Sequence, residues 1–154
     1  MRKITCVLFL VILVLANYAQ ADRCDHSCQM SLVESYFDKL TVVYRLGSTP
    51  ADIEALFAEL HPSVRYEHIR YGAAFSRDDW QDAFVRNQEN DAYQNDSELM
   101  IQVSNAIQGD SHIAVAYSYG RVDEHGDWQP DGDQDLMALF TIENGKISRV
   151  QEYW

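Results

Sequence analysis

The spacing of hydrophobic residues changes twice along the chain. An uninterrupted apolar run, CVLFLVILVLA, occupies residues 6–16. Apolar residues then recur every three to four positions in three stretches between residues 31 and 87, which is the spacing of amphipathic helices. From residue 98 onward, apolar and polar residues mostly alternate, as in strands with one buried face. The pattern therefore predicts a short leader, a mainly helical first part and a sheet-forming second part.

Capping signals mark the start of three helices. The capping box SLVE at residues 31–34 predicts a first helix that ends near Gly47. Thr49 followed by Pro50 predicts a short second helix, which Pro62 would end, and SRDD at residues 76–79 predicts a third. The apolar stripes of these helices would contain Leu32, Val33, Tyr36, Phe37, Leu40 and Val43, then Ile53, Leu56, Phe57 and Leu60, then Trp80, Ala83, Phe84 and Asn87.

One strand is expected between the second and third helices, and four after the third. In SVRYEHIRYG, residues 63–72, strand geometry would place Val64, Tyr66 and His68 on one face and Arg65 and Glu67 on the other. The last four strands would form an antiparallel meander with a polar loop, HGDWQPDGDQ, and an Asn-Gly turn before the final strand. This order of elements indicates an α+β fold in which helices pack on the concave side of one curved sheet.

The leader has the features of a secretory signal. Arg2 and Lys3 precede the apolar run, and Ala19 and Ala21 occupy the −3 and −1 positions of a cleavage site after Ala21. The run is short for a membrane span, although an uncleaved anchor is the alternative interpretation. We therefore expect a signal peptide over 1–21, an N-terminal segment over 22–29 and one domain over 30–154. The protein would be secreted or periplasmic, with no stable membrane insertion after cleavage.

The remaining chain is strongly acidic. Without Arg2 and Lys3 it carries 10 basic and 24 acidic residues, a formal net charge of −14. Such a charge repels phosphate backbones and anionic lipid, so a nucleic acid is not an expected partner. The acidic segment over 123–135 lacks the spacing of an EF-hand loop, and we expect no metal site there.

Two cysteines, Cys24 and Cys28, remain after cleavage, in the sequence CDHSC. In an oxidising compartment a pair this close is expected to form a disulfide that closes a small loop. An intermolecular bridge, a redox pair and a Cys-x-His-x-Cys metal site that uses His26 are the alternatives. The spacing differs from the C-x-x-C of redox enzymes, and no fourth metal ligand is apparent.

The order of elements and several segments resemble the nuclear transport factor 2-like superfamily, within it the SnoaL-like and ketosteroid-isomerase-like branch. The matching segments are YFDKL, DIEALFAELHPSVRYEH and GKISRVQEYW. The resemblance extends over residues 30–154 and implies a cystatin-like cone, in which three N-terminal helices cover a curved, mainly antiparallel sheet. It also implies a pocket inside the cone and a homodimer formed through the outer face of the sheet.

The resemblance implies roles for individual residues. The ketosteroid-isomerase-like pattern has V-E-D-P where this chain has Y-E-H-I, so the base position falls on His68. The tyrosine of the first helix that donates to the developing enolate oxygen matches Tyr36, whereas its acidic partner falls at Ala138. Tyr66 would be a further donor. The pocket wall would include Val64, Trp80, Phe84 and Trp154.

Two hypotheses follow for the function. In the first, the chain is a lyase or isomerase of a small hydrophobic carbonyl compound, with His68 as base and Tyr36 and Tyr66 as hydrogen-bond donors. In the second, it is a non-catalytic module of the same fold that binds a small hydrophobic molecule or a partner chain. The fold hosts both classes, and the missing acidic partner at Ala138 favours the second slightly. Neither hypothesis requires a cofactor.

Overall fold

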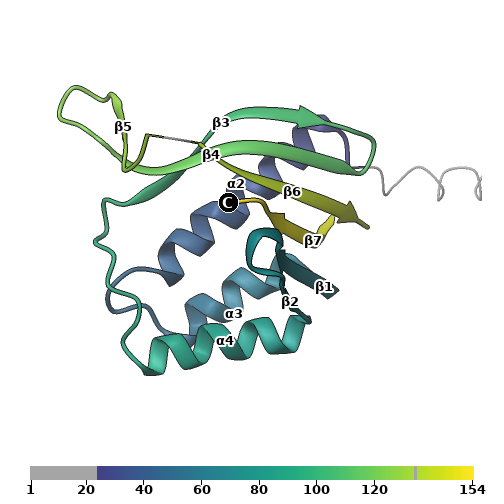
Figure 1. Ribbon diagram of the computed structural model, residues 1–154, viewed down its shortest axis with the longest axis horizontal. Helices are drawn as coiled ribbons and strands as arrows, with labels where there is room; N and C mark the ends of the chain where they lie inside the picture. The colour runs from purple at the N-terminus through teal and green to yellow at the C-terminus, as the bar shows by residue number, and fades with distance from the viewer. Residues whose placement is uncertain (1–23, 134) are drawn as a thin grey trace, which may run out of the picture.

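The computed structural model describes residues 24–133 and 135–154 (Figure 1). The expected signal peptide and its cleavage site lie outside the described residues. Three α-helices and a seven-stranded sheet make up the described chain. In chain order the elements are α2 (His26–Val43), α3 (Pro50–Ala58), β1 (Leu60–His68), the 3₁₀ turn η1 (Ile69–Tyr71), β2 (Ala73–Phe75), α4 (Arg77–Glu89), β3 (Met100–Gln108), β4 (His112–Val122), β5 (Trp128–Pro130), β6 (Leu136–Glu143) and β7 (Lys146–Glu152).

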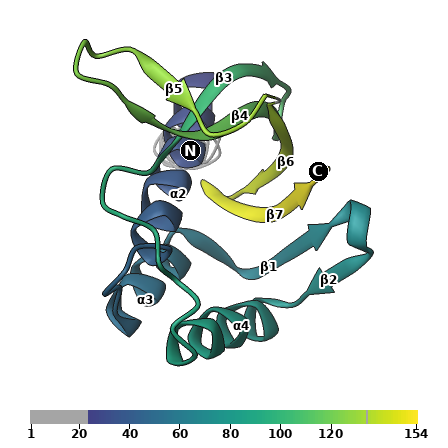
Figure 2. The same ribbon diagram turned by 60° about the vertical axis from the view of Figure 1, so that its left-hand side comes forward.

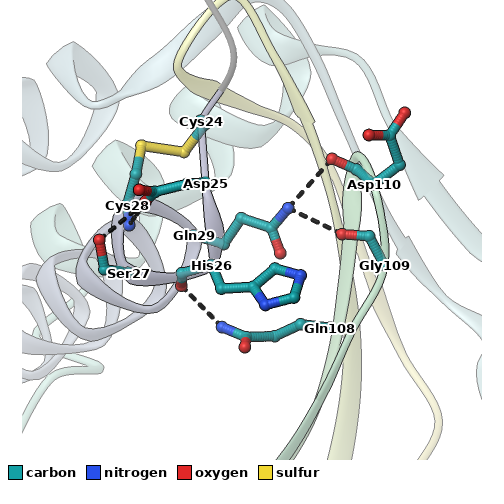
Figure 3. Close-up of a disulfide and its surroundings, with 9 residues drawn as sticks. All are labelled: Cys24, Asp25, His26, Ser27, Cys28, Gln29, Gln108, Gly109 and Asp110. Atoms are coloured by element: carbon teal, nitrogen blue, oxygen red, sulfur yellow. Dashed lines mark hydrogen bonds between the residues drawn. A yellow bond between two sulfur atoms is a disulfide. The ribbon is translucent and has the colours of Figure 1, made fainter.

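The first helix begins earlier than predicted. The carboxylate of Asp25 accepts a hydrogen bond from the Cys28 backbone N–H at 2.9 Å and so caps α2 at His26. Ser31, the predicted cap, therefore lies inside the helix. Cys24 and Cys28 form a disulfide with a Cα–Cα distance of 5.2 Å, which closes the same turn (Figure 3). A helix start that uses one aspartate without a capping box is harder to recognise than the SLVE motif.

The other two helices begin as predicted. Thr49 and Asp52 form a capping box at the start of α3, and the Ser76 hydroxyl accepts a hydrogen bond from the Asp79 backbone N–H at the start of α4. The prediction for the end of α3 was wrong, because Leu60 and Pro62 belong to β1. Pro62 lies where the β1–β7 register shifts, between Leu60 and Arg65, so its missing N–H interrupts no regular pairing.

The sheet is mixed and curved, with strand order β2-β1-β7-β6-β4-β3 and β5 paired to β4 (Figure 2). All neighbouring strands are antiparallel except β1 and β7, which pair in parallel. The β1–β7 pairing joins β1 and β2 to the strands that follow α4, so that all seven strands form one sheet. Helices α2, α3 and α4 lie along the inner side of this sheet. The predicted α+β class and mainly antiparallel sheet are confirmed.

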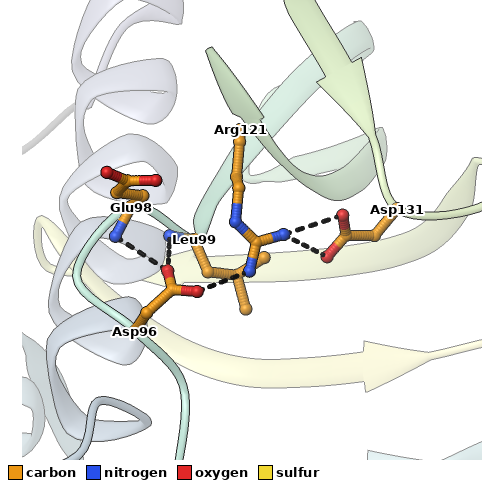
Figure 4. Close-up of polar contacts among 5 residues, drawn as sticks. All are labelled: Asp96, Glu98, Leu99, Arg121 and Asp131. Atoms are coloured by element: carbon orange, nitrogen blue, oxygen red, sulfur yellow. Dashed lines mark hydrogen bonds and ion pairs between the residues drawn. The ribbon is translucent and has the colours of Figure 1, made fainter. Parts of the chain in front are cut away.

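Two short strands were not predicted. The strand expected over 63–72 ends at His68, because η1 follows and Gly72 adopts a positive φ of 61° before β2. The segment expected to be a polar loop contains β5, which pairs antiparallel with the end of β4 (Figure 1). Arg121 of β4 pairs with Asp96 at 2.8 Å and Asp131 at 3.0 Å, and so connects the approach to β3 with this hairpin (Figure 4).

The hydrophobic core lies between the helices and the concave face of the sheet. Aromatic rings dominate its centre, where Phe37 of α2 lies 4.7 Å from Tyr117 of β4 and 5.7 Å from Phe140 of β6, measured between ring centroids. Among the described residues, no helix is long and apolar enough to cross a membrane. The core also includes Val33, Tyr36, Leu40, Ile53, Leu56, Phe57, Ile113, Val115, Ile147 and Val150.

Candidate functional site

Two of the hollows in the structure differ in the chemistry of their walls. The larger one, about 560 Å³, lies beside the disulfide and is lined by the turn at Gly109 and the start of α2. Its wall is a mixture of backbone and small polar groups, including Gln29, whose amide nitrogen donates to the Gly109 and Asp110 carbonyls (Figure 3). The smaller one, about 190 Å³, lies inside the cone and contains a buried carboxylate. The second hollow, named the aromatic pocket below, is therefore the candidate site.

Seven aromatic side chains form most of the wall of the aromatic pocket. The ring of Tyr66 on β1 stacks on Trp80 of α4 at 4.7 Å and 21°, and Tyr44 stacks on Phe84 at 6.0 Å and 23°. The apolar stripe of α4 brings Trp80 and Phe84 to the cone, as its helical spacing predicts. The complete lining is Tyr36, Tyr44, Tyr66, Phe75, Trp80, Ala83, Phe84, Asn87, Tyr93 and Glu152.

Glu152, at the end of β7, is the one carboxyl group of this wall. It is only 5% exposed, and its carboxylate accepts hydrogen bonds from the Tyr66 hydroxyl at 2.5 Å and from the Tyr117 hydroxyl at 3.2 Å. The Trp154 indole N–H in turn donates to the Tyr117 hydroxyl at 2.8 Å. Among the described residues, Glu152 takes part in no salt bridge.

Burial determines the protonation chemistry of the pocket. Loss of hydration raises the pKa of Glu152 above its usual value of 4.5, and the hydrogen bonds from Tyr66 and Tyr117 and the proximity of His68 oppose this rise. Burial, together with the nearby Glu152 charge, also raises the pKa of Tyr36 and of Tyr66. These tyrosines are therefore neutral hydrogen-bond donors at physiological pH, and Glu152 is the group of this wall best suited to accept or release a proton.

His68 points to the inner side of the sheet but lies outside the lining of the aromatic pocket. It is 6% exposed, and its ring lies 4.4 Å from that of Tyr71 and 4.7 Å from that of Trp154. Both ring nitrogens are buried without a hydrogen-bond partner within the described chain. His68 pairs with Glu152 in the β1–β7 register, so the carboxylate occupies the place next to the expected base.

The other residues expected at the site divide into two groups. Tyr36, Tyr66, Trp80 and Phe84 line the aromatic pocket together. Val64 and Trp154 do not line it, contrary to expectation. Val64 of β1 is buried in the hydrophobic core. Trp154 follows β7, and its ring packs on that of His68.

Sequence reasoning missed Glu152, Tyr44 and Tyr93. A signal for Glu152 was present, because Val150 and Glu152 are two residues apart in a strand and so share a face. Ala138, where the resemblance places an acidic group, pairs with Glu152 in the β6–β7 register, so this chain carries its carboxylate on the neighbouring strand. Tyr44 directly follows α2, and Tyr93 lies in the loop after α4. No periodic pattern predicts the direction of a side chain at such positions.

Within the described residues, no group of three or more His, Cys, Asp or Glu side chains is arranged to hold a metal ion. The alternative use of Cys24 and Cys28 as metal ligands with His26 therefore has no geometric support, since both sulfur atoms form the disulfide.

Comparisons with known proteins identify the fold. No family model matches the chain, and no curated protein sequence does. A candidate ketosteroid isomerase from Kribbella flavida is similar in structure, with a TM-score of 0.55, 23% identity and coverage of 85% of this chain and 80% of that one. A candidate polyketide cyclase from Xanthomonas campestris pv. campestris has a TM-score of 0.52 and 18% identity, with 83% and 90% covered.

A third similar structure is a hypothetical protein with a ketosteroid isomerase-like fold from Catenulispora acidiphila, in complex with trimethylamine. Its TM-score is 0.51 and its identity 15%, with 80% of this chain and 84% of that one covered. These likenesses extend over most of both chains. The chain therefore has the nuclear transport factor 2-like fold.

Proposed function

We propose that the protein binds a small organic molecule in the aromatic pocket, with Glu152 as its polar anchor. The observation that carries this proposal is an aromatic cavity of about 190 Å³ with one buried carboxylate on its wall. Ligand sites are usually concave, mainly apolar and provided with a few polar groups that fix orientation. The complex of the Catenulispora acidiphila protein with trimethylamine supports a small-molecule site in this fold.

A variant that fills the pocket tests the proposal. Ala83→Leu places a larger side chain on the pocket wall, whereas Ala55→Leu makes the same change on the exposed side of α3. We expect small molecules that bind the wild type in an NMR-detected fragment screen to lose affinity for Ala83→Leu and to keep it for Ala55→Leu. Equal binding to both variants, or no ligand for the wild type, would contradict the proposal.

Proton-transfer catalysis is the second candidate function, a lyase or isomerase acting on a small carbonyl compound. The raised pKa of Glu152 favours it, because a carboxylate with a raised pKa is a stronger base than an exposed one. In this version Glu152 replaces His68 as base, and Tyr36 and Tyr66 donate hydrogen bonds to the developing negative charge on oxygen. The similar structures include a candidate isomerase and a candidate cyclase.

Exchange of carbon-bound protons separates catalysis from binding. Wild-type protein that abstracts a proton beside a carbonyl would accelerate deuterium incorporation into cyclohexanone in D₂O, measured by proton NMR. Glu152→Gln should abolish this acceleration, and His68→Phe should keep it. A wild-type rate equal to the buffer rate counts against catalysis and leaves the binding function in place.

Export is part of the proposal. The Cys24–Cys28 disulfide supports it, because such bonds persist in oxidising compartments. Secretion with cleavage after Ala21 would give a chain that begins at Asp22, and the intact mass of protein recovered outside the cytoplasm tests this. A mass that includes residues 1–21 would contradict it.

The homodimer is also proposed, through the outer face of the sheet. There Arg149 bonds to Glu67 at 2.7 Å, and His112, Thr141 and Ser148 lie around them. The mass measured by analytical ultracentrifugation should be twice that of one chain. A monomer at all concentrations would contradict this part of the proposal.

A further inference from the structure

The charge inside the aromatic pocket is not balanced by a cation in its wall. His68, the neighbour of Glu152 in the β1–β7 register, lies outside the lining and forms no salt bridge with it. The pocket lining contains no Lys, Arg or His, and its single charged group is the Glu152 carboxylate. Each salt bridge in the described part of the chain lies elsewhere. Two tyrosine hydroxyls hydrogen-bond the carboxylate but bring no positive charge to it. A buried carboxylate without a cation is costly, and an occupant with a positive charge would compensate it.

The aromatic rings favour the same kind of occupant. The face of an aromatic ring carries partial negative charge and attracts a cation within about 6 Å of its centroid, most strongly for Trp. Trp80, Tyr66, Tyr44, Tyr93 and Phe84 surround the pocket with ring centroids 4.7 to 6.2 Å from their neighbours. A cation in this cavity of about 190 Å³ would therefore lie close to several aromatic rings at once.

The size and the charge of the pocket restrict the class of ligand. At roughly 30 Å³ per water, the cavity has the volume of about six waters, so it suits a ligand of about that many non-hydrogen atoms. A hydrated metal ion prefers several oxygen ligands, and the wall offers one carboxylate. An anion would meet that carboxylate and the negative ring faces. A methylated ammonium group, with a diffuse charge on an apolar surface, fits both features of the wall.

We infer that the ligand of the aromatic pocket is a small organic cation that carries a methylated ammonium group. The charged group lies against the faces of Trp80, Tyr44 and Tyr93, and the Glu152 carboxylate neutralises its charge. This inference rests on the proposed binding function, and it specifies the chemical class of the ligand. The net charge of −12 for the full chain also favours the approach of cations from solution.

Choline and its neutral isostere 3,3-dimethylbutan-1-ol test the inference. The two compounds have almost the same shape, and a carbon replaces the charged nitrogen in the alcohol. Titration of the wild-type protein at about pH 7.5, followed by calorimetry or NMR, should show a roughly tenfold or larger preference for choline, the size expected from several cation–π contacts and a desolvated carboxylate. Glu152→Gln should remove most of this preference, and the exposed Glu143→Gln should keep it.

A second variant tests the aromatic contribution if Glu152→Gln does not fold. Tyr93→Leu keeps an apolar side chain at a half-buried position of the wall and removes one ring. Choline affinity should fall by roughly fivefold, while affinity for the alcohol should stay within about twofold.

Equal affinity of the wild type for the two compounds would overturn the inference and leave the binding function intact. If the wild type binds the alcohol but not choline, the inference is likewise overturned and the binding function is kept. If neither compound binds, the inference is also overturned, and the fragment screen with Ala83→Leu then decides separately whether the pocket binds any small molecule.

Discussion

Removing the hydroxyl of Tyr66 isolates the hydrogen bond that holds the buried carboxylate. In Tyr66→Phe the ring can keep its stacking on Trp80, whereas Glu152 loses its 2.5 Å donor and keeps the weaker one from Tyr117 at 3.2 Å. A hydrogen bond to a charged group contributes about 1.5 to 3 kcal/mol, and a neutral one about 0.5 to 1.5 kcal/mol. The free energy of unfolding should therefore fall by about 1.5 to 3 kcal/mol when Glu152 is ionised.

The size of this loss should depend on pH in a defined direction. In the wild type, the folded pKa of Glu152 lies above its unfolded value near 4.5, so its contribution to stability decreases as pH rises from about 4.5 through the folded pKa. Tyr66→Phe removes an interaction that lowers this pKa, and so the pKa of Glu152 rises further. Below about pH 4.5 the carboxyl is protonated in both states, and only the smaller, neutral hydrogen bond is lost.

Urea unfolding at about pH 4 and pH 7.5 measures both effects. With a slope of about 1.5 to 2 kcal/mol per molar urea, the midpoint of Tyr66→Phe should fall by roughly 1 M at pH 7.5, and by less at pH 4. Tyr119→Phe makes the same chemical change on β4, at a hydroxyl that does not bond Glu152, and serves as the control. Equal losses for Tyr66→Phe and Tyr119→Phe, or a loss independent of pH, would refute the proposed role of this hydrogen bond.

Three other variants test separate parts of the structure. Cys24→Ser with Cys28→Ser should lower stability by about 2 kcal/mol, the loop entropy of so short a closure, and the reducing agent TCEP should change the thermal midpoint of the wild type but not of the variant. Gly120→Ala should destabilise the β4–β5 hairpin, because the new Cβ would lie 2.3 Å from the Gln129 carbonyl oxygen; hydrogen exchange that stays unchanged there would contradict this contact. His68→Phe should stabilise the protein by about 1 kcal/mol, since it removes two buried nitrogens without partners, and a large loss in thermal unfolding would show that His68 has a partner.

Local pattern determined most of the secondary structure. The caps at Thr49 and Ser76 start α3 and α4 because their side chains satisfy free backbone N–H groups within one turn. The turn at Asn144-Gly145 has φ values of 52° and 69°, which is the conformation that these two residues favour in a two-residue hairpin. Such signals involve residues a few positions apart and can be read without knowledge of the fold. The SLVE box shows their limit, since an earlier cap at Asp25 replaced it.

Residue spacing also predicted part of the wall of the aromatic pocket. Strand alternation turned Tyr66 and His68 inward, and helical spacing on α4 brought Trp80 and Phe84 to the same cone. It could not show which of the inward polar groups faces a cavity. His68 and Glu152 are partners in the β1–β7 register, yet the pocket wall includes only Glu152. That difference depends on side chains from other elements, such as Tyr71 and Trp154, that cover the imidazole.

What the sequence alone determined was the class of fold, the helix and strand periods, the close cysteine pair and the excess of acidic residues. Tertiary structure decided the parallel pairing of β1 with β7, which joins segments more than eighty residues apart. It also decided the surroundings of Glu152, because the tyrosines that bond it come from β1 and β4. The physical reason is that the burial and the partners of a carboxylate depend on long-range packing, which no local spacing of residues encodes.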